Sequence, residues 1–146
     1  MKKRGDSALN ECKISDLSVG QFHEEEYVVT EEMGKEFAEI SQDFNSIHLD
    51  KEFAEHSRFG QRIVHGMLVG SYISGIIGNK FPGPGSIYMS QSLKFCKPIY
   101  YDQKFFIKVE VTEIDKEKHR VMLRTICRDA MDNKLVDGEA KIYIEK

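Results

Sequence analysis

The chain has 146 residues, of which 31% are charged and 40% hydrophobic, and its formal net charge at pH 7 is -3. This size and composition are typical of one globular domain with a sizeable core. The slight negative charge, without a basic run, argues against a nucleic-acid partner. Cys12, Cys96 and Cys127 are far apart and form no CxxC pair. They predict a reducing, cytoplasmic setting without disulfides or zinc.

The N-terminal residues 1–20 are polar, and their basic start lacks the apolar run that a signal peptide needs. We expect them to form a loose lead-in before a single domain over residues 21–146. Within that domain, residues 27–30 (YVVT) have a high strand propensity.

Two short helices are predicted next. Thr30 can cap the first, and two glutamates follow in the first turn, where the helix dipole favours acidic residues. Met33, Phe37 and Ile40 have helical spacing, so we expect this apolar face to lie on the core. The first helix should end near Gln42. Asp50 is the expected cap of the second, which should end before residue 60.

Residues 63–79 contain no Asp, Glu, Lys or Arg. Small residues recur in this stretch at i+4 spacing, namely Gly66, Gly70, Ser74 and Gly78. A membrane-spanning helix is one interpretation, because GxxxG patterns mediate the pairing of such helices. Spanning needs roughly 20 predominantly apolar residues, however, and this stretch is too short and contains polar side chains. We therefore expect no membrane association but a helix buried on most faces, with close packing against its small residues.

After a turn at residues 81–85, the hydrophobic period changes to two. The expected strands cover residues 87–95, 105–111, 121–127 and 140–144, and breaks able to turn hairpins fall at 97–98, 115–118 and 131–134. Sequential strands with short connections predict an antiparallel sheet. The hydrophobic helix should cover its apolar face. The predicted fold class is thus α+β, a single domain with an antiparallel sheet wrapped around a long central hydrophobic helix.

Residues 41–50 (SQDFNSIHLD) place a carboxylate, an amide and an imidazole within six positions, among apolar side chains. Asp43 and His48 would diverge on a helix and would lie on opposite faces of a strand. Only an irregular turn can bring them together, and Asn45 with Ser46 is suitable turn chemistry. Polar groups buried with apolar neighbours must find partners or do chemistry. The segment is therefore predicted to form a functional site.

These residues also carry a family resemblance. Residues 43–48 (DFNSIH) resemble the D-x-N-x-x-H signature of the (R)-specific enoyl-CoA hydratases, which are MaoC-like dehydratases with a hot-dog fold. Residues 63–67 (IVHGM) resemble the V-H-G-M motif that opens the central helix of that family. The strand after it is similar at residues 86–88 and 91–95. The resemblance runs from about Val28 to the C-terminus and departs at Ser46, often proline in the family, which affects the rigidity of the turn.

The resemblance implies reversible hydration of a trans-2-enoyl-CoA to an (R)-3-hydroxyacyl-CoA, for which no cofactor is expected. No cluster of residues has metal-ligand spacing, so no metal ion is predicted. The resemblance also implies a homodimer, or a dimer of dimers, in which two sheets join edge to edge. Asp43 and His48 would hold the water between them. We expect Asp43 to act as general base, strengthened by burial beside Phe44 and Ile47. His48 would orient the water and supply the proton for the α-carbon.

Further residues are expected to support this chemistry. A backbone N–H at Gly66, with the helix dipole behind it, could hold the thioester oxygen as charge develops there; close packing is the alternative reason for glycine. Asn45 would hold either the turn or the water. Ser74 resembles a family serine near the catalytic aspartate, or is only a small packed residue. His65 is expected to be a structural hydrogen-bonder. The acyl pocket is expected beside Ile73, Ile76 and Ile77.

Two other functions remain open. A hot-dog acyl-CoA thioesterase could use the same aspartate to direct water at the thioester carbonyl. A non-catalytic acyl-thioester-binding module would need neither Asp43 nor His48. Because the two occur together with Asn45, the hydratase interpretation is favoured.

Overall fold

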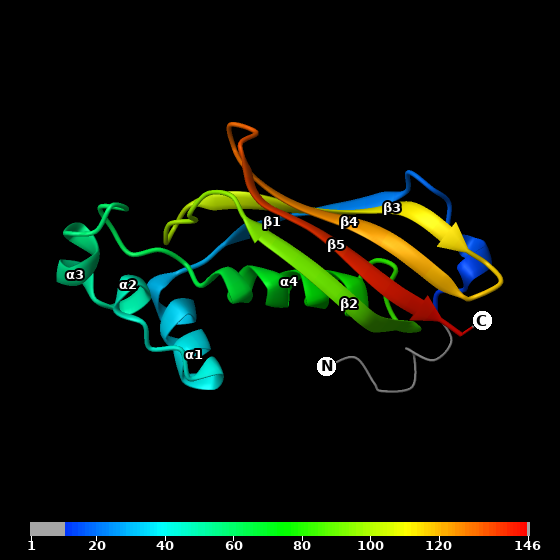
Figure 1. Cartoon of the computed structure of the whole chain (residues 1–146), viewed down its shortest axis with the longest axis horizontal. Helices are drawn as coiled ribbons and strands as arrows, with labels where there is room; N and C mark the ends of the chain where they lie inside the picture. The colour runs from blue at the N-terminus through cyan, green and yellow to red at the C-terminus, as the bar shows by residue number, and fades with distance from the viewer. Residues whose placement is uncertain (1–10, 146) are drawn as a thin grey trace.

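An antiparallel sheet curls around one central helix in the computed structural model, which describes residues 11–145 (Figure 1). The strands are β1 (Phe22–Val28), β2 (Ser86–Phe95), β3 (Lys104–Asp115), β4 (Arg120–Asp129) and β5 (Lys134–Ile144). Their order in the sheet is β1-β3-β4-β5-β2, and every neighbouring pair is antiparallel. The central helix is α4 (Gly66–Asn79). This arrangement confirms the predicted α+β architecture.

The core lies between α4 and the concave face of the sheet. Ile73, Ile76 and Ile77 of α4 are at most 1% exposed, and they meet fully buried strand residues such as Phe105 and Leu123. Each such side chain contributes roughly 1.5–3 kcal/mol by leaving water. This packing fixes the position of α4, and with it the position of its first turn. None of the helices between residues 11 and 145 is both long and apolar enough to cross a membrane.

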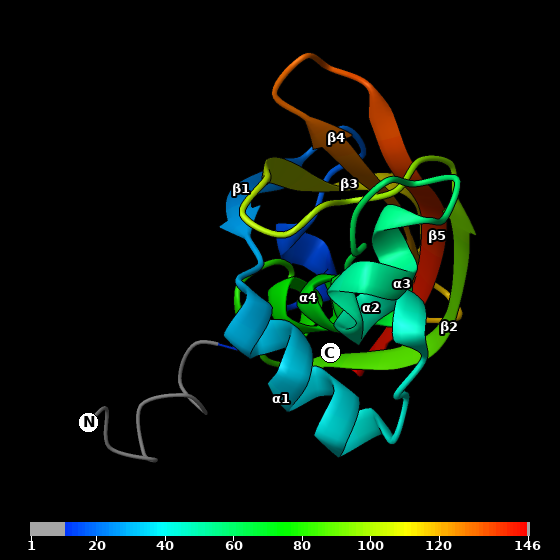
Figure 2. The ribbon, with the colours of Figure 1, turned by 90° about the vertical axis from the view of Figure 1, so that its left-hand side faces the viewer.

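Two of the three predicted hairpins are confirmed, at residues 115–118 and 131–134. The prediction at residues 97–98 is wrong, because β2 pairs with β5 and not with β3. Packing against α4 explains the difference. A Cβ on Gly66 would lie 2.5 Å from the Phe95 ring, and one on Gly70 would lie 3.0 Å from Leu93 Cδ1. Strand β2 therefore closes the sheet around the helix (Figure 2), and the chain must cross over to reach β3.

Three short helices cover one end of α4: α1 (Glu31–Ser41), α2 (Ser46–Leu49) and α3 (Lys51–Glu55) (Figure 2). The predicted caps are confirmed, since Thr30 Oγ1 accepts from the backbone N–H of Met33 and Asp50 Oδ1 from that of Phe53. Helix α1 ends as predicted, with Gln42 in the left-handed region at φ 63°.

The predicted apolar face of α1 is confirmed for Phe37, which packs against the core, but it is wrong for Ile40 and Met33 in this single chain. Ile40 is 85% exposed and Met33 is 40% exposed, whereas Gly34 and Ala38 are buried. The reason is the side chain of Tyr101, which lies so close that a Cβ on Gly34 would be 2.7 Å from its ring. Helix α1 thus contacts the domain through its small residues Gly34 and Ala38 together with Phe37.

The prediction of a loose lead-in over residues 1–20 is corrected for residues 11–20, which pack against the domain. Residues 1–10 lie outside the described part of the chain. Ile14 and Leu17 are 8% and 7% exposed and belong to the core. The backbone N–H of Cys12 donates to the carbonyl of Pro84 over 2.8 Å. These residues close the end of the core opposite the short helices, so they are part of the domain.

Helix α4 is less enclosed than predicted. Its core-facing side is buried, but Met67 is 60% exposed and Ser74 and Gly78 are also exposed. Close packing against the small residues holds for Gly66 and Gly70, whereas a Cβ on Gly78 would meet nothing within 4 Å. One face of the helix is therefore open in the single chain.

Candidate active site

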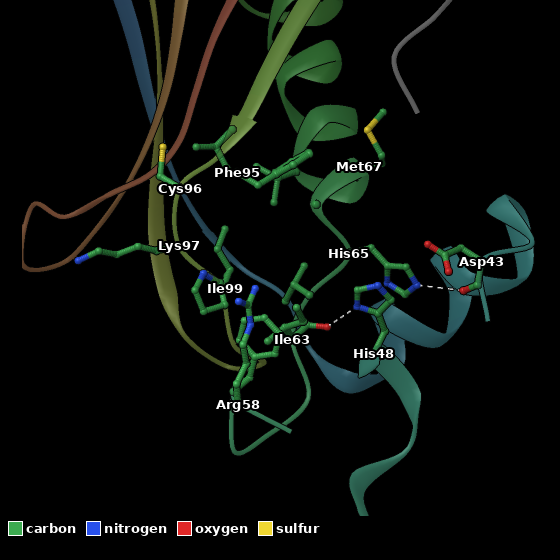
Figure 3. A pocket seen from close by; sticks show the side chains of 16 residues that line it. Asp43, His48, Arg58, Ile63, His65, Met67, Phe95, Cys96, Lys97 and Ile99 are labelled. Atoms are coloured by element: carbon green, nitrogen blue, oxygen red, sulfur yellow. Dashed lines mark hydrogen bonds between the residues drawn. The ribbon is translucent and has the colours of Figure 1, made fainter. Parts of the chain in front are cut away.

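A pocket of about 370 Å³ lies at the N-terminal end of α4. Asp43, His48 and His65 lie together on one side of it, and Arg58 and Lys97 lie across from them (Figure 3). The apolar part of its wall is formed by Met67, Val69, Phe95, Ile99 and Val136. The pocket thus combines a polar cluster with a hydrophobic compartment, as is usual for sites that bind small molecules.

The turn after α1 presents the Asp43 carboxylate. Its Oδ1 accepts from the backbone N–H of Asn45 over 3.1 Å, and its own N–H donates to Ser41 Oγ. No hydrogen bond within residues 11–145 engages the second oxygen, so it is free to contact a ligand. The predicted burial is not found, since Asp43 is exposed and Phe44 is 55% exposed. Hydrogen bonds, and not apolar neighbours, hold this turn.

His48 lies on α2, and its imidazole tautomer is set by a backbone carbonyl. Nδ1 lies 2.8 Å from the oxygen of Ile63, which can only accept, so Nδ1 carries the proton. Nε2 is left with a free lone pair. Burial lowers the pKa of His48 below its ordinary value of 6.5, and the neighbouring His65 adds to this effect. The Ile63 carbonyl and the Asp43 carboxylate oppose the shift. The net effect favours a neutral ring.

His65 is the N-cap residue of α4 and is 1% exposed. Its ring stacks on that of His48, with centroids 3.9 Å apart, and Phe37 meets it edge-on at 5.1 Å. Nε2 lies 3.1 Å from the backbone oxygen of Asp43, so it carries the proton and donates. The hydrogen bond expected of His65 is therefore present. It joins the start of α4 to the turn that carries Asp43.

Gly66 opens α4, and no side chain caps this helix end. The first N–H groups of a helix have no partner within it, and the dipole makes this end favourable for negative charge. Because Gly66 lines the pocket, these donors are close to any ligand there. The close contact with Phe95 also requires glycine. Close packing, one of the two predicted reasons for glycine, is therefore observed, and the role of this N–H as a donor to the thioester oxygen stays a prediction.

The other predicted site residues are not brought into the pocket. Asn45 Oδ1 accepts from the backbone N–H of Ile47 and caps α2, which favours its structural interpretation. Ser74 is exposed, and eight residues along a helix place it roughly 12 Å from Gly66. Ile73, Ile76 and Ile77 belong to the core and not to the pocket lining.

Sequence reasoning missed the far wall of the pocket. Arg58, Phe95, Lys97 and Ile99 come from a loop and from the end of β2, and no local pattern connects them to residues 41–50. The crossover after β2, which the predicted hairpin at residues 97–98 obscured, brings Lys97 and Ile99 there, and the loop between α3 and α4 brings Arg58.

The geometry also bears on metal binding. One potential ligand atom from each of Asp43, His48 and His65 lies within 4.8 Å of the others. A tetrahedral zinc ion needs ligand lone pairs that converge on one point. The two rings are stacked with only 25° between their planes, so their in-plane lone pairs lie in nearly parallel planes and do not readily converge on one point. This geometry suits a hydrogen-bonded water better than a metal ion.

Comparisons with known proteins identify the family. A family model described as a MaoC like domain matches residues 19–130. A 3-hydroxybutyryl-CoA dehydratase of Methylorubrum extorquens is 38% identical over 141 residues, covering 91% of this chain and 89% of the relative. An (R)-specific enoyl-CoA hydratase of Aeromonas caviae is 42% identical over 108 residues, covering 74% and 81%. The solved structure of an R-hydratase of Pseudomonas aeruginosa superposes with a TM-score of 0.86 at 36% identity, covering 92% and 86%.

The chain therefore belongs to the MaoC-like family, and its fold is the hot-dog fold of the R-hydratases. This confirms the resemblance found in the motifs at residues 43–48 and 63–67.

A first prediction concerns the protonation of His48. We expect its imidazole to be neutral at pH 7, with the proton on Nδ1, and to gain a second proton only as the pH falls below 6.5, because burial disfavours the charged ring. ¹⁵N NMR titration of the imidazole nitrogens measures this, and the His48→Gln variant assigns the signal. A midpoint at or above 6.5 would contradict the expected effect of burial.

Proposed function

We propose that the protein catalyses the reversible hydration of a trans-2-enoyl-CoA to an (R)-3-hydroxyacyl-CoA. The observation that carries the proposal is the meeting of a free Asp43 carboxylate oxygen and the unprotonated Nε2 of His48 beside the uncapped start of α4. Two acceptors can hold a water molecule, and the helix start can hold an oxyanion. Relatives named as hydratase and dehydratase support the same chemistry.

The proposed reaction begins with the thioester oxygen at the N–H of Gly66, which makes the β-carbon electrophilic. Asp43 and Nε2 of His48 each accept a hydrogen bond from the water. As the water oxygen bonds to the β-carbon, one of its protons passes to Nε2, and the imidazolium then gives a proton to the α-carbon. The negative charge of Asp43 stabilises the imidazolium. Net addition is one water, and dehydration is the reverse.

This scheme divides the proton transfers differently from the sequence-based expectation. That expectation made Asp43 the general base. The Ile63 carbonyl leaves Nε2 of His48 unprotonated, and burial favours the neutral ring. Both observations favour His48 as the group that takes the water proton, with Asp43 orienting the water.

The acyl chain is proposed to lie along the apolar wall formed by Val69, Phe95, Ile99 and Val136. Ile73, Ile76 and Ile77 support this wall from the core without lining the pocket.

The carrier is proposed to be coenzyme A, which bears several phosphate groups. Arg58 and Lys97 offer positive charge at the pocket, and neither forms a salt bridge with any described residue. The Arg58 guanidinium lies 4.7 Å above the ring of Phe59, which steadies it without neutralising it. Lys97 Nζ is 3.5 Å from Asn133 Oδ1, a neutral group. Two cations without a salt bridge to a described residue suit a polyanionic carrier.

We further propose a homodimer formed through the β2 edge of the sheet. The opposite edge, β1, carries three successive glutamates, which discourage pairing with another strand. Edge strand β2 instead exposes Ile87, Met89 and Phe95 at 54%, 46% and 51%. An exposed apolar edge of this kind favours addition of a second sheet.

The proposed reaction predicts that Asp43→Asn and His48→Ala each lower kcat for crotonyl-CoA by at least about 100-fold. His48→Ala removes the group that transfers the proton, and Asp43→Asn removes the negative charge that orients the water and stabilises the imidazolium. The amide oxygen introduced by Asp43→Asn can still accept from the N–H of Asn45, so the turn should persist; circular dichroism checks the fold. Asp50→Asn is the matched control, because asparagine also caps helices well. Near-normal turnover in either site variant would contradict the mechanism.

The same assay separates the alternative functions. Loss of the enoyl-thioester absorbance without thiol release indicates a hydratase. Thiol release indicates a thioesterase, and neither change indicates a binding module. Coupling to an (R)-specific or an (S)-specific 3-hydroxyacyl-CoA dehydrogenase determines the stereochemistry of the product.

The proposed carrier predicts that Arg58→Ala raises KM for crotonyl-CoA up to about fivefold, the loss expected for one exposed charge contact. It should leave KM unchanged for crotonyl-N-acetylcysteamine, which lacks the phosphates. Arg120→Ala, an exposed arginine on another part of the sheet, is the control. An equal rise in KM for both thioesters would argue against phosphate recognition by Arg58.

The proposed dimer predicts that Ile87→Glu shifts the protein to the monomer in analytical ultracentrifugation, because a buried charge at the joint would lack a partner. Phe22→Glu, at a residue 56% exposed on the β1 edge, should leave the dimer intact. If Phe22→Glu dissociates the dimer and Ile87→Glu does not, the interface lies at the β1 edge and the proposal is wrong.

A further inference from the structure

The burial of a polar histidine at position 65 is not explained by core packing alone. It is 1% exposed, yet its Nδ1 is buried without a hydrogen-bond partner among the described residues. An unsatisfied buried polar atom is destabilising, and an apolar ring of similar shape would avoid that cost. A histidine kept in such a place is therefore expected to serve something other than core packing.

The contacts of His65 reach both members of the proposed catalytic pair. Its Nε2–H donates to the backbone oxygen of Asp43, 22 positions earlier in the chain, over 3.1 Å. Its face lies against the His48 ring at a centroid distance of 3.9 Å, and Phe37 supports it edge-on. Figure 3 shows the ring between the Asp43 turn and His48, at the start of α4. One side chain thus contacts the main chain of one residue and the ring of the other.

No other described side chain contacts the pair in this way. Tyr101 Oη donates to the backbone carbonyl of His48 over 2.9 Å, and the Ile63 carbonyl holds the edge of the ring. Neither contact reaches Asp43. Asp43 is an exposed residue, and it is otherwise held by hydrogen bonds local to its own turn. The distance between the two groups therefore depends on the residue that bridges them.

We propose that His65 is a positioning residue that clamps the Asp43 main chain and the His48 ring in one mutual geometry. This inference rests on the proposed hydration reaction. Because α4 is anchored in the core, His65 transmits its fixed position to a turn that is otherwise exposed. Misplacement of reacting groups by about 1 Å can lower a rate on the order of 100-fold.

His65 also bears on the charge state of His48. The groups around that ring are Asp43 and His65 on its own side of the pocket, with Arg58 and Lys97 on the far side. His65 opposes protonation of His48, whereas Asp43 favours it. Replacing His65 by a side chain that cannot be protonated should therefore raise the pKa of His48, so the loss of activity at low pH should begin at a higher pH.

Two variants separate the two contacts. His65→Phe keeps an aromatic face against His48 but loses the donor to Asp43. His65→Gln keeps an amide N–H that can reach the Asp43 carbonyl but loses the ring. We expect His65→Phe to lower kcat for crotonyl-CoA on the order of 10- to 100-fold with KM changed less than about threefold. His65→Gln should recover part of that kcat.

The His48 titration gives a second readout that does not depend on turnover. In both variants its NMR midpoint should move to higher pH, and thermal unfolding reports whether the fold survives. If wild-type protein hydrates nothing, the proposed function fails while the titration still tests the His65 contact. Wild-type kcat and an unchanged His48 midpoint in His65→Phe would overturn the proposal. So would a loss of kcat that only follows the loss of folded protein; if His65→Phe does not fold, His65→Gln is judged by the same two measurements.

Discussion

The burial of α4 against the concave face of the sheet is the constraint on which the site depends. Ile73, Ile76 and Ile77 leave the helix no freedom to slide, because each is held among fully buried strand residues. The Phe95 ring lies against Gly66 and fixes the start of α4. A helix start that is rigid and uncapped can present donors to a ligand at constant geometry. The hydrophobic core thus defines the polar end of the pocket.

The polar cluster depends on backbone groups more than on other side chains. The carbonyl of Ile63 sets the tautomer of His48, and the carbonyl of Asp43 sets that of His65. The two histidines consequently keep opposite nitrogens free, Nε2 on His48 and Nδ1 on His65. Only Nε2 of His48 takes part in the proposed reaction. Because carbonyls cannot donate, this assignment does not depend on pH until a ring is protonated.

Much of the fold could be predicted from the sequence because its determinants are local. Thr30 and Asp50 cap helices within three residues, and period-two alternation marks the strands. The motif residues Asp43, His48 and Gly66 were found by spacing and resemblance, and the structure brings them to one pocket. Exposure of Ile40 and the β2 crossover were missed, since both depend on contacts between distant segments. The pocket wall at Arg58 could not be predicted for the same reason.

The pocket that contains the exposed Asp43 lies next to the exposed β2 edge of the sheet. Phe95 lines the pocket and is 51% exposed, and Met67 beside it is 60% exposed. Hydration chemistry benefits from excluding bulk water, which strengthens the interactions of the catalytic groups. A second sheet added at β2 in the proposed dimer would lie next to Phe95 and therefore next to the pocket. Phe95 would then contribute both to the dimer interface and to the pocket. A variant that separates the protomers should therefore weaken turnover even with Asp43 and His48 intact.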